Sequence, residues 1–211
     1  MSVPIIIEEV CFVCENESRQ TVLASTNQFG APDLDLRPPE MARSTMCWWV
    51  HECPHCGYVS EDLSDETTVT KEWLESEEYL SLDNIKFEDE LAIIFYKRYL
   101  INNKERHYKS AFNALLRSAW ACDDANDVEN AVYCRKKAIE TLKKFKASGK
   151  QKDTFVLIKA DLLRRSGQFD LLIEELKDKT FSDEFLNKVA GFQIEKARQK
   201  DTACYTLADV Q

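Results

Sequence analysis

Four cysteines in two short pairs are the residues of this chain whose spacing predicts chemistry. Two residues separate Cys11 from Cys14, and two separate Cys53 from Cys56 within the run Cys-Pro-His-Cys-Gly. Each C-x-x-C turn directs two thiolates toward one centre, so two turns supply the four sulfur ligands of a tetrahedral zinc site. The proline and the glycine favour a tight turn. The sequence therefore predicts one structural Zn²⁺ per chain, held by these four residues.

Other interpretations of the cysteines stay open. Eight cysteines, with acidic Glu8 and Glu9 in place of a basic leader segment, favour reduced thiols in the cytoplasm over disulfides. A redox pair is expected within a β-α-β pattern, which surrounds neither C-x-x-C turn. A catalytic zinc needs three protein ligands and an open position. His51 or Cys47 would have to replace a cysteine in that case, and His55 inside the second turn is expected to face solvent.

The long interval between the two pairs predicts an enlarged zinc ribbon. Thirty-eight residues separate Cys14 from Cys53, against roughly 15–20 in the common four-cysteine pattern. The interval must hold a hairpin and an inserted loop. Strands are expected over 4–10, 20–26 and 45–52, because β-branched and aromatic residues are frequent there.

The inserted loop, Phe29–Arg43, is rich in proline and charge. Two interpretations of it are open. Asp33 or Asp35 pairs with Arg37 or Arg43 to hold a loop without a core, or the loop forms a binding or catalytic surface beside the metal. A nucleophile or base with an orienting partner would mark an enzyme. The spacing here demands none, so the sequence names no catalytic residue.

Composition and charge narrow the classes of protein. The chain has 211 residues, 44% of them apolar, and no apolar run as long as a membrane span. Residues 61–90 hold 12 acidic and two basic side chains, whereas residues 91–211 hold 23 basic and 17 acidic ones. The acidic N-terminal half argues against a zinc ribbon that grips a phosphate backbone.

Beyond the second cysteine pair the pattern becomes helical. Asp65 or Thr70 is expected to cap a first helix through Trp73 and Leu80. Apolar residues then recur at helical spacing in the segments 87–100, 108–120, 128–142, 155–163, 169–176 and 185–197. The predicted fold class is α+β, mostly α. Its expected parts are a zinc ribbon over 1–62, acidic connecting helices over 63–104 and a helical array over 105–211.

Two helix pairs resemble tetratricopeptide repeats. The second pair carries the motif's small residue, glycine turn and aromatic at Ala160, Gly167 and Phe169. The first pair offers Ala119 and the Asn126-Asp127 turn. Ala119 lies 41 residues before Ala160, whereas the repeat period of this motif is about 34 residues. A plain helical bundle is the alternative.

The whole chain also resembles a bacterial family of unknown function, which joins a two-knuckle ribbon to an array of this type. The matching stretches are Cys11/Cys14, Phe29–Glu40, Arg43–Thr45, Cys53–Tyr58 and Leu162–Phe169. The resemblance implies the architecture and supplies no activity.

A basic stretch in the array suggests a partner. Residues 131–166 hold 11 basic and three acidic side chains. Asp161, Arg164 and Arg165 are expected on the concave side of the array, where an Arg fork pairs with carboxylates. The stretch could bind an acidic peptide, the chain's own residues 61–90, or nucleic acid. A homodimer is a further option.

The function predicted from the sequence is a non-catalytic, cytoplasmic zinc adaptor that binds a protein partner through its repeats. A zinc-dependent hydrolase or redox enzyme beside the 33–43 loop is the first alternative. Nucleic-acid binding through 131–166 is the second.

Overall fold

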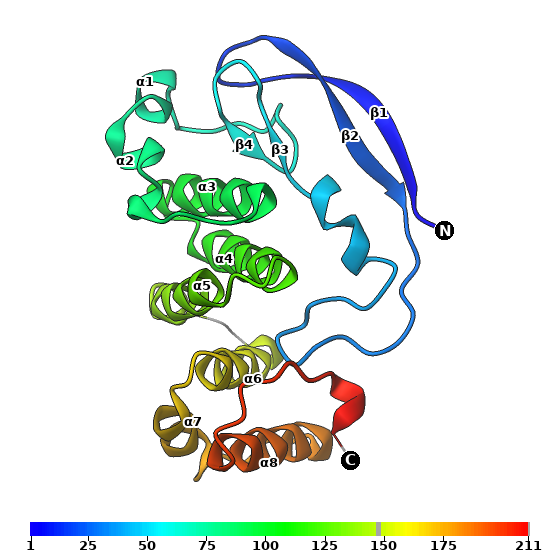
Figure 1. Ribbon diagram of the computed structural model, residues 1–211, viewed down its shortest axis with the longest axis vertical. Helices are drawn as coiled ribbons and strands as arrows, with labels where there is room; N and C mark the ends of the chain where they lie inside the picture. Colours follow the sequence, from blue (N-terminus) through cyan, green and yellow to red (C-terminus); the bar gives the residue numbers. More distant parts are fainter. Residues whose placement is uncertain (147–148, 211) are drawn as a thin grey trace.

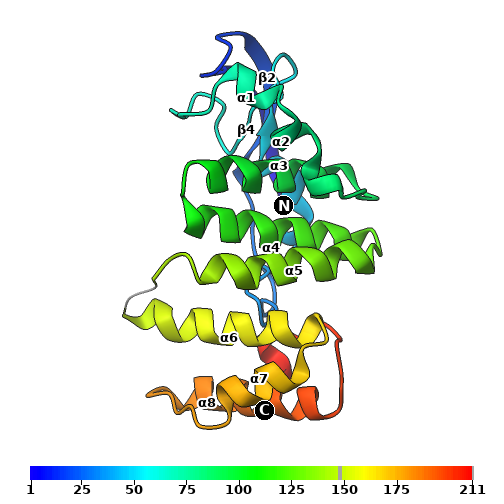
Figure 2. The same cartoon turned by 90° about the vertical axis from the view of Figure 1, so that its left-hand side faces the viewer.

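A computed structural model describes residues 1–146 and 149–210. The fold is α+β and mostly helical, as predicted, with a β-rich N-terminal part along one side of a ladder of helices (Figure 1). Seen from a second direction, the helices lie one above another in chain order (Figure 2). The ladder consists of α3 (Glu90–Lys104), α4 (Tyr108–Asp124), α5 (Val128–Leu142), α6 (Lys150–Arg165), α7 (Phe169–Leu176) and α8 (Glu184–Arg198).

Two antiparallel hairpins build the N-terminal part. In the first, β1 (Val3–Val10) pairs with β2 (Glu17–Ser25), so that Val10 lies opposite Glu17. In the second, β3 (His51–Glu52) pairs with β4 (Val59–Ser60). Each hairpin turn contains one cysteine pair, and a long loop joins the hairpins. The inserted loop predicted between the cysteine pairs is therefore present. The hairpin predicted within the same interval is wrong, because β2 and β3 each pair with a strand outside it.

The strand predicted over 45–52 is wrong for all but its last two residues. Arg43–Trp48 forms a 3₁₀-helix, η1. Thr45 stabilises this helix by local hydrogen bonds. Its N–H and its hydroxyl both donate to the carbonyl of Ala42, at 3.0 and 2.7 Å. The Trp49 indole N–H donates in turn to the Thr45 hydroxyl at 3.0 Å. These local bonds outweigh the β preference of the segment.

The helix expected through Trp73 and Leu80 is interrupted. It forms two single turns, α1 (Lys71–Leu74) and α2 (Glu77–Leu80), followed by the 3₁₀ turn η2 (Leu82–Asn84). Thr70 is the N-cap of α1, and its hydroxyl accepts from the N–H of Trp73 at 3.4 Å. A last 3₁₀ turn, η3 (Leu207–Asp209), lies in the C-terminal tail.

The helix turns of the ladder follow the predicted residues. Asn126 and Gly167 adopt the left-handed conformation, with φ of 59° and 72°. In both turns the next N–H bonds back across the helix end at 2.8 Å, from Asp127 to Cys122 and from Gln168 to Leu163. This C-terminal motif closes one helix and lets an antiparallel neighbour begin directly. Among the described residues, no helix is both long and apolar enough to cross a membrane.

Candidate metal centre

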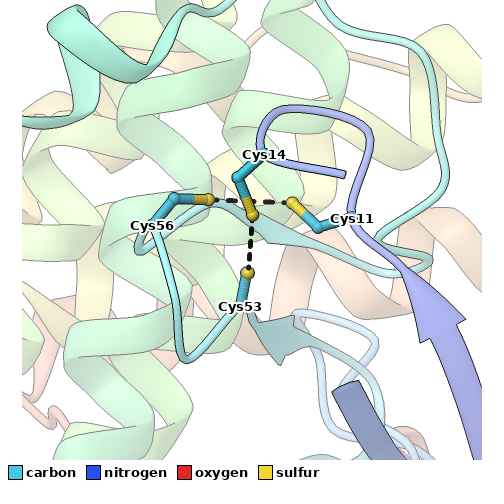
Figure 3. Close-up of side chains that lie close together, drawn as sticks. All are labelled: Cys11, Cys14, Cys53 and Cys56. Carbon is cyan, nitrogen blue, oxygen red and sulfur yellow. Dashed lines mark hydrogen bonds between the residues drawn. The ribbon is translucent and has the colours of Figure 1, made fainter. Parts of the chain in front are cut away.

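The four predicted cysteines converge on one point. The Sγ atoms of Cys11, Cys14, Cys53 and Cys56 all lie within 4.8 Å of one another (Figure 3). The sulfurs of Cys11 and Cys56 are 3.7 Å apart, and those of Cys14 and Cys53 are 3.6 Å apart. Four thiolates bound to Zn²⁺ at about 2.3 Å in a tetrahedron lie about 3.8 Å from one another. The cluster therefore has the size of a single tetrahedral four-sulfur site.

The two turns that carry the sulfurs have matching backbone bonds. The N–H of Cys11 donates to the carbonyl of Asn16 at 3.0 Å, and the N–H of Cys53 donates to that of Tyr58 at 2.8 Å. Backbone N–H groups also face the sulfurs, from Asn16 toward Cys14 and from Tyr58 toward Cys56. These dipoles stabilise negative charge on the thiolates. The local chain is thus arranged to present four ligands.

The residue after each pair occupies the same left-handed position. It is Glu15 in the first turn, with φ 57°, and Gly57 in the second, with φ 74°. A side chain in this conformation costs about 1–2 kcal/mol, and glycine avoids that cost. Glu15, which stands where the second turn has glycine, therefore leaves the geometry of the first turn intact at an energetic cost.

We expect Gly57→Ala to lower the free energy of unfolding by about 1–2 kcal/mol. A Cβ at this position would lie 3.7 Å from Oε1 of Glu52, an ordinary contact, so the cost is conformational. Gly191→Ala is the matched control, because that glycine lies in α8 with open space around it. The control should be neutral or stabilising by up to about 1 kcal/mol. Urea unfolding of both variants checks this, and equal effects at the two glycines would contradict it.

The thiols differ in how easily they ionise. Burial raises the pKa of Cys11 and of Cys56 above the usual thiol value. Burial also opposes ionisation of Cys14, but hydrogen bonds from Asn16 and the neighbouring Cys53 lower its pKa to about 6. Four adjacent thiolates repel one another unless a cation lies between them. A divalent ion would deprotonate all four and compensate their charge.

The histidines and the remaining cysteine near the cluster are not part of it. Among the described residues, the group that could hold a metal contains only the four cysteines. His51 is buried in β3 opposite Ser60, and burial lowers its pKa. His55 is exposed, and so is Cys47. The structure therefore brings neither predicted replacement ligand to the sulfurs.

The second cysteine turn is anchored on the helices. The hydroxyl of Tyr79 in α2 donates to the carbonyl of Gly57 at 2.7 Å. The guanidinium of Arg98 in α3 donates to the carbonyl of Val59 at 3.2 Å. Tyr79 is 1% exposed, so its bond lies in the core that continues from the cysteines into the ladder. The order of the metal centre is thereby coupled to α2 and α3.

The long loop is held by its acidic residues. Asp33 pairs with Arg43 at 2.5 Å, as the structural interpretation predicted. Asp35 reaches further: its Oδ2 accepts from the indole N–H of Trp120 in α4 at 2.7 Å and from Arg165 in α6 at 3.4 Å. Both aspartates are almost fully buried. Sequence reasoning missed Trp120, because nothing local marks a partner 85 residues away.

The three residues predicted to bind a partner are engaged within the chain. Arg164 is fully buried and donates to Asp161 at 2.5 Å. It also donates to the carbonyls of Asp201 and Ala203 in the C-terminal tail, at 3.1 and 2.6 Å. With Arg165 bound to the loop, this face of the ladder is covered by the chain itself (Figure 1). Contact of these three residues with a partner stays a prediction. It requires the loop and the C-terminal tail to move away from this face.

Comparison with known proteins places the chain in a family. The model of the family described as "Uncharacterized protein conserved in bacteria (DUF2225)" matches residues 8–203. The chain belongs to this family. The match includes both cysteine turns and the whole helical ladder, which agrees with the bacterial family that the sequence resembles. No curated protein and no solved structure matches the chain.

Proposed function

We propose that this protein is a non-catalytic zinc-binding adaptor whose helical array binds a partner protein. The observation that carries the proposal is the four-sulfur cluster with the spacing of a tetrahedral site. Thiolates in this geometry favour Zn²⁺. Four protein ligands complete the coordination and leave no position for a substrate or a reactive water. The metal then has the structural role of holding the two hairpins together.

The array supplies the binding surface in this proposal. We assign 1–62 to the ribbon, 63–104 to connecting helices and 105–211 to an array of tetratricopeptide type. The left-handed turns at Asn126 and Gly167 support short antiparallel connections within α4–α5 and α6–α7, and Arg106 makes the same turn between α3 and α4. Arrays of helix pairs expose extended faces on which peptides bind. A partner protein is therefore the ligand class that suits the ladder.

Two observations support an adaptor over the alternatives. The acidic residues of the 33–43 loop that an enzyme would use are buried, and Asp33 and Asp35 are bonded to Arg43 and Trp120. In the basic stretch 131–166, the arginines that would grip phosphates are internal.

Metal analysis together with in-cell cross-linking tests the proposal. For protein purified without added metal, we expect one zinc per chain and four sulfurs at about 2.3 Å in X-ray absorption spectra. A nitrogen or a water oxygen in the coordination shell would instead favour the zinc-dependent enzyme. Cross-linking of the tagged chain should yield a stoichiometric protein partner joined to residues 105–211. Cross-links to RNA alone would contradict the adaptor.

A further inference from the structure

A groove runs between α5, α6 and α7 on the face of the ladder that the loop does not cover. It consists of two adjoining hollows of about 420 and 320 Å³, which share Ile139, Lys143, Lys159 and Glu175. All lining residues of both hollows come from 136–175. These helices face the viewer in Figure 2. The groove is thus distinct from the metal centre and from the face that holds Arg164.

The floor of the groove is apolar. Leu142, Phe145 and Phe155 line it and are only partly buried against the core. Leu171 on α7 is 59% exposed at its edge. Exposed apolar side chains that adjoin one another in a hollow are a feature of binding sites.

The rim of the groove is cationic. Exposed lysines line it at positions 136, 143, 146 and 152. Within the described part of the chain, none of these four pairs with a carboxylate. A fifth lysine, Lys159, bonds to Glu175 at 2.5 Å across the junction of the two hollows. Glu140 and Glu175 are the acidic residues that line the hollows, so positive charge dominates.

The basic stretch 131–166 is therefore divided between two roles. Its arginines point inward: Arg135 and Arg165 both bond to Asp123, and Arg164 bonds to Asp161. Among the described side chains of this stretch, the lysines that bond to no other side chain are those at the rim of the groove. The positive charge noted in the sequence thus reaches the surface mainly at this site.

We propose that this groove binds an acidic segment of a partner protein, in which carboxylates alternate with apolar side chains. The inference rests on the adaptor function proposed above and names the surface and the chemistry of the partner. Apolar side chains of the segment would fill the floor, and its carboxylates would reach the rim lysines. Glu175 holds the place of one partner carboxylate on Lys159.

Nucleic acid fits this groove less well. Phe145 and Phe155 pack edge-on at 5.3 Å, and Phe155 packs edge-on against Phe112 at 5.5 Å. Each ring therefore has an edge or a face in contact with a neighbouring ring, which leaves less open ring surface on which bases could stack. A phosphate backbone would use the lysines and leave the apolar floor exposed. A peptide with both kinds of side chain satisfies both features.

Fluorescence anisotropy with defined peptides tests the proposal on the full chain. The probe is a fluorescein-labelled 12-residue peptide of alternating Glu and Leu, compared with Glu-Ser and Lys-Leu peptides. We expect the Glu-Leu peptide to bind most tightly. The double variant K136E/K143E should bind it at least about tenfold more weakly, because attraction becomes repulsion. The control K86E/K188E reverses two exposed lysines outside the groove and should change the affinity less than about twofold.

Two single variants sharpen the test. Glu175→Gln frees Lys159 and should strengthen binding about two- to fivefold. Leu171→Ser removes apolar area from the edge and should weaken it several-fold. Circular dichroism confirms that each variant is folded.

The proposal is overturned if the groove and control variants bind the Glu-Leu peptide equally. It is also overturned if a 12-nucleotide oligo-uridine or vesicles of phosphatidylglycerol bind more tightly than the peptide through the same lysines. A cross-linked protein partner whose contacts map outside 136–175 would contradict the proposal that the groove is the binding site, but it would still support the adaptor function. Failure to find any protein partner would instead remove the adaptor.

Discussion

Replacing Cys53 by serine should abolish metal binding and unfold the N-terminal part, whereas Cys47→Ser should leave both unchanged. Cys53 is 1% exposed and its sulfur lies 3.6 Å from that of Cys14. Cys47 is exposed and outside the cluster. The same change of sulfur to oxygen is made in both variants, so the difference between them isolates the metal site.

The expected effect is large because neither two-stranded hairpin is stable by itself. Isolated two-stranded hairpins are at most marginally stable in water. Binding of a structural Zn²⁺ contributes about 10–16 kcal/mol to the folding of small zinc domains. Several apolar side chains of β1 are exposed, including Ile6 at 72%, so this hairpin has a limited core of its own. Without the metal, we expect the ribbon to unfold while the helical ladder persists.

Zinc content and circular dichroism measure the two parts separately. The Cys53→Ser protein should contain less than about one tenth of a zinc per chain, with a largely preserved helical signal. A chelator should produce the same spectrum from the wild-type protein. If Cys53→Ser retained one zinc and the wild-type melting temperature, the four-sulfur assignment would be wrong.

The sequence predicted best those features that depend on local spacing. Two C-x-x-C turns identify four ligands without any knowledge of the fold, because the metal imposes the geometry. Apolar periodicity likewise predicted the six helices of the ladder, and Gly167 marked a turn that requires positive φ. In each case one stretch of chain carries the information.

Features that depend on distant partners could not be predicted. Arg165 meets Asp35 across 130 positions, and Arg164 binds carbonyls of a tail 37 and 39 residues away. Read locally, both arginines belong to a solvated basic stretch. The 3₁₀-helix at 43–48 was missed for a related reason, because hydrogen bonds of Thr45 outweigh its β propensity.

Replacing Arg164 by methionine should lower the free energy of unfolding by about 3–5 kcal/mol. Arg164 is fully buried, and its guanidinium bonds to Asp161 and to two tail carbonyls. Its loss leaves the Asp161 carboxylate buried without a counter-charge. Arg198→Met is the matched control, because Arg198 is exposed at the end of α8, and it should change stability by less than about 0.5 kcal/mol.

A pH series identifies the cause. Burial raises the pKa of Asp161 above its usual value, and Arg164 opposes that shift. Without Arg164 the pKa rises further. The ionised group then destabilises the fold at high pH, and the penalty disappears as Asp161 takes up a proton. The difference in free energy of unfolding between the wild type and Arg164→Met should therefore become smaller as the pH is lowered from about 8 to about 5.

The double variant Asp161→Leu/Arg164→Met decides between two roles for Arg164. If Arg164 stabilises the fold through its ion pair with Asp161, the double variant should lose less free energy of unfolding than the two single variants together. The expected difference is about 1–3 kcal/mol. The tail at Asp201 and Ala203 would still loosen, because it loses its donor. If Arg164→Met were as stable as the Arg198→Met control, the arginine would not be needed for the fold. It would then be available to bind a partner on the concave face, as the sequence predicts. That face would be a second candidate binding surface beside the groove between α5, α6 and α7.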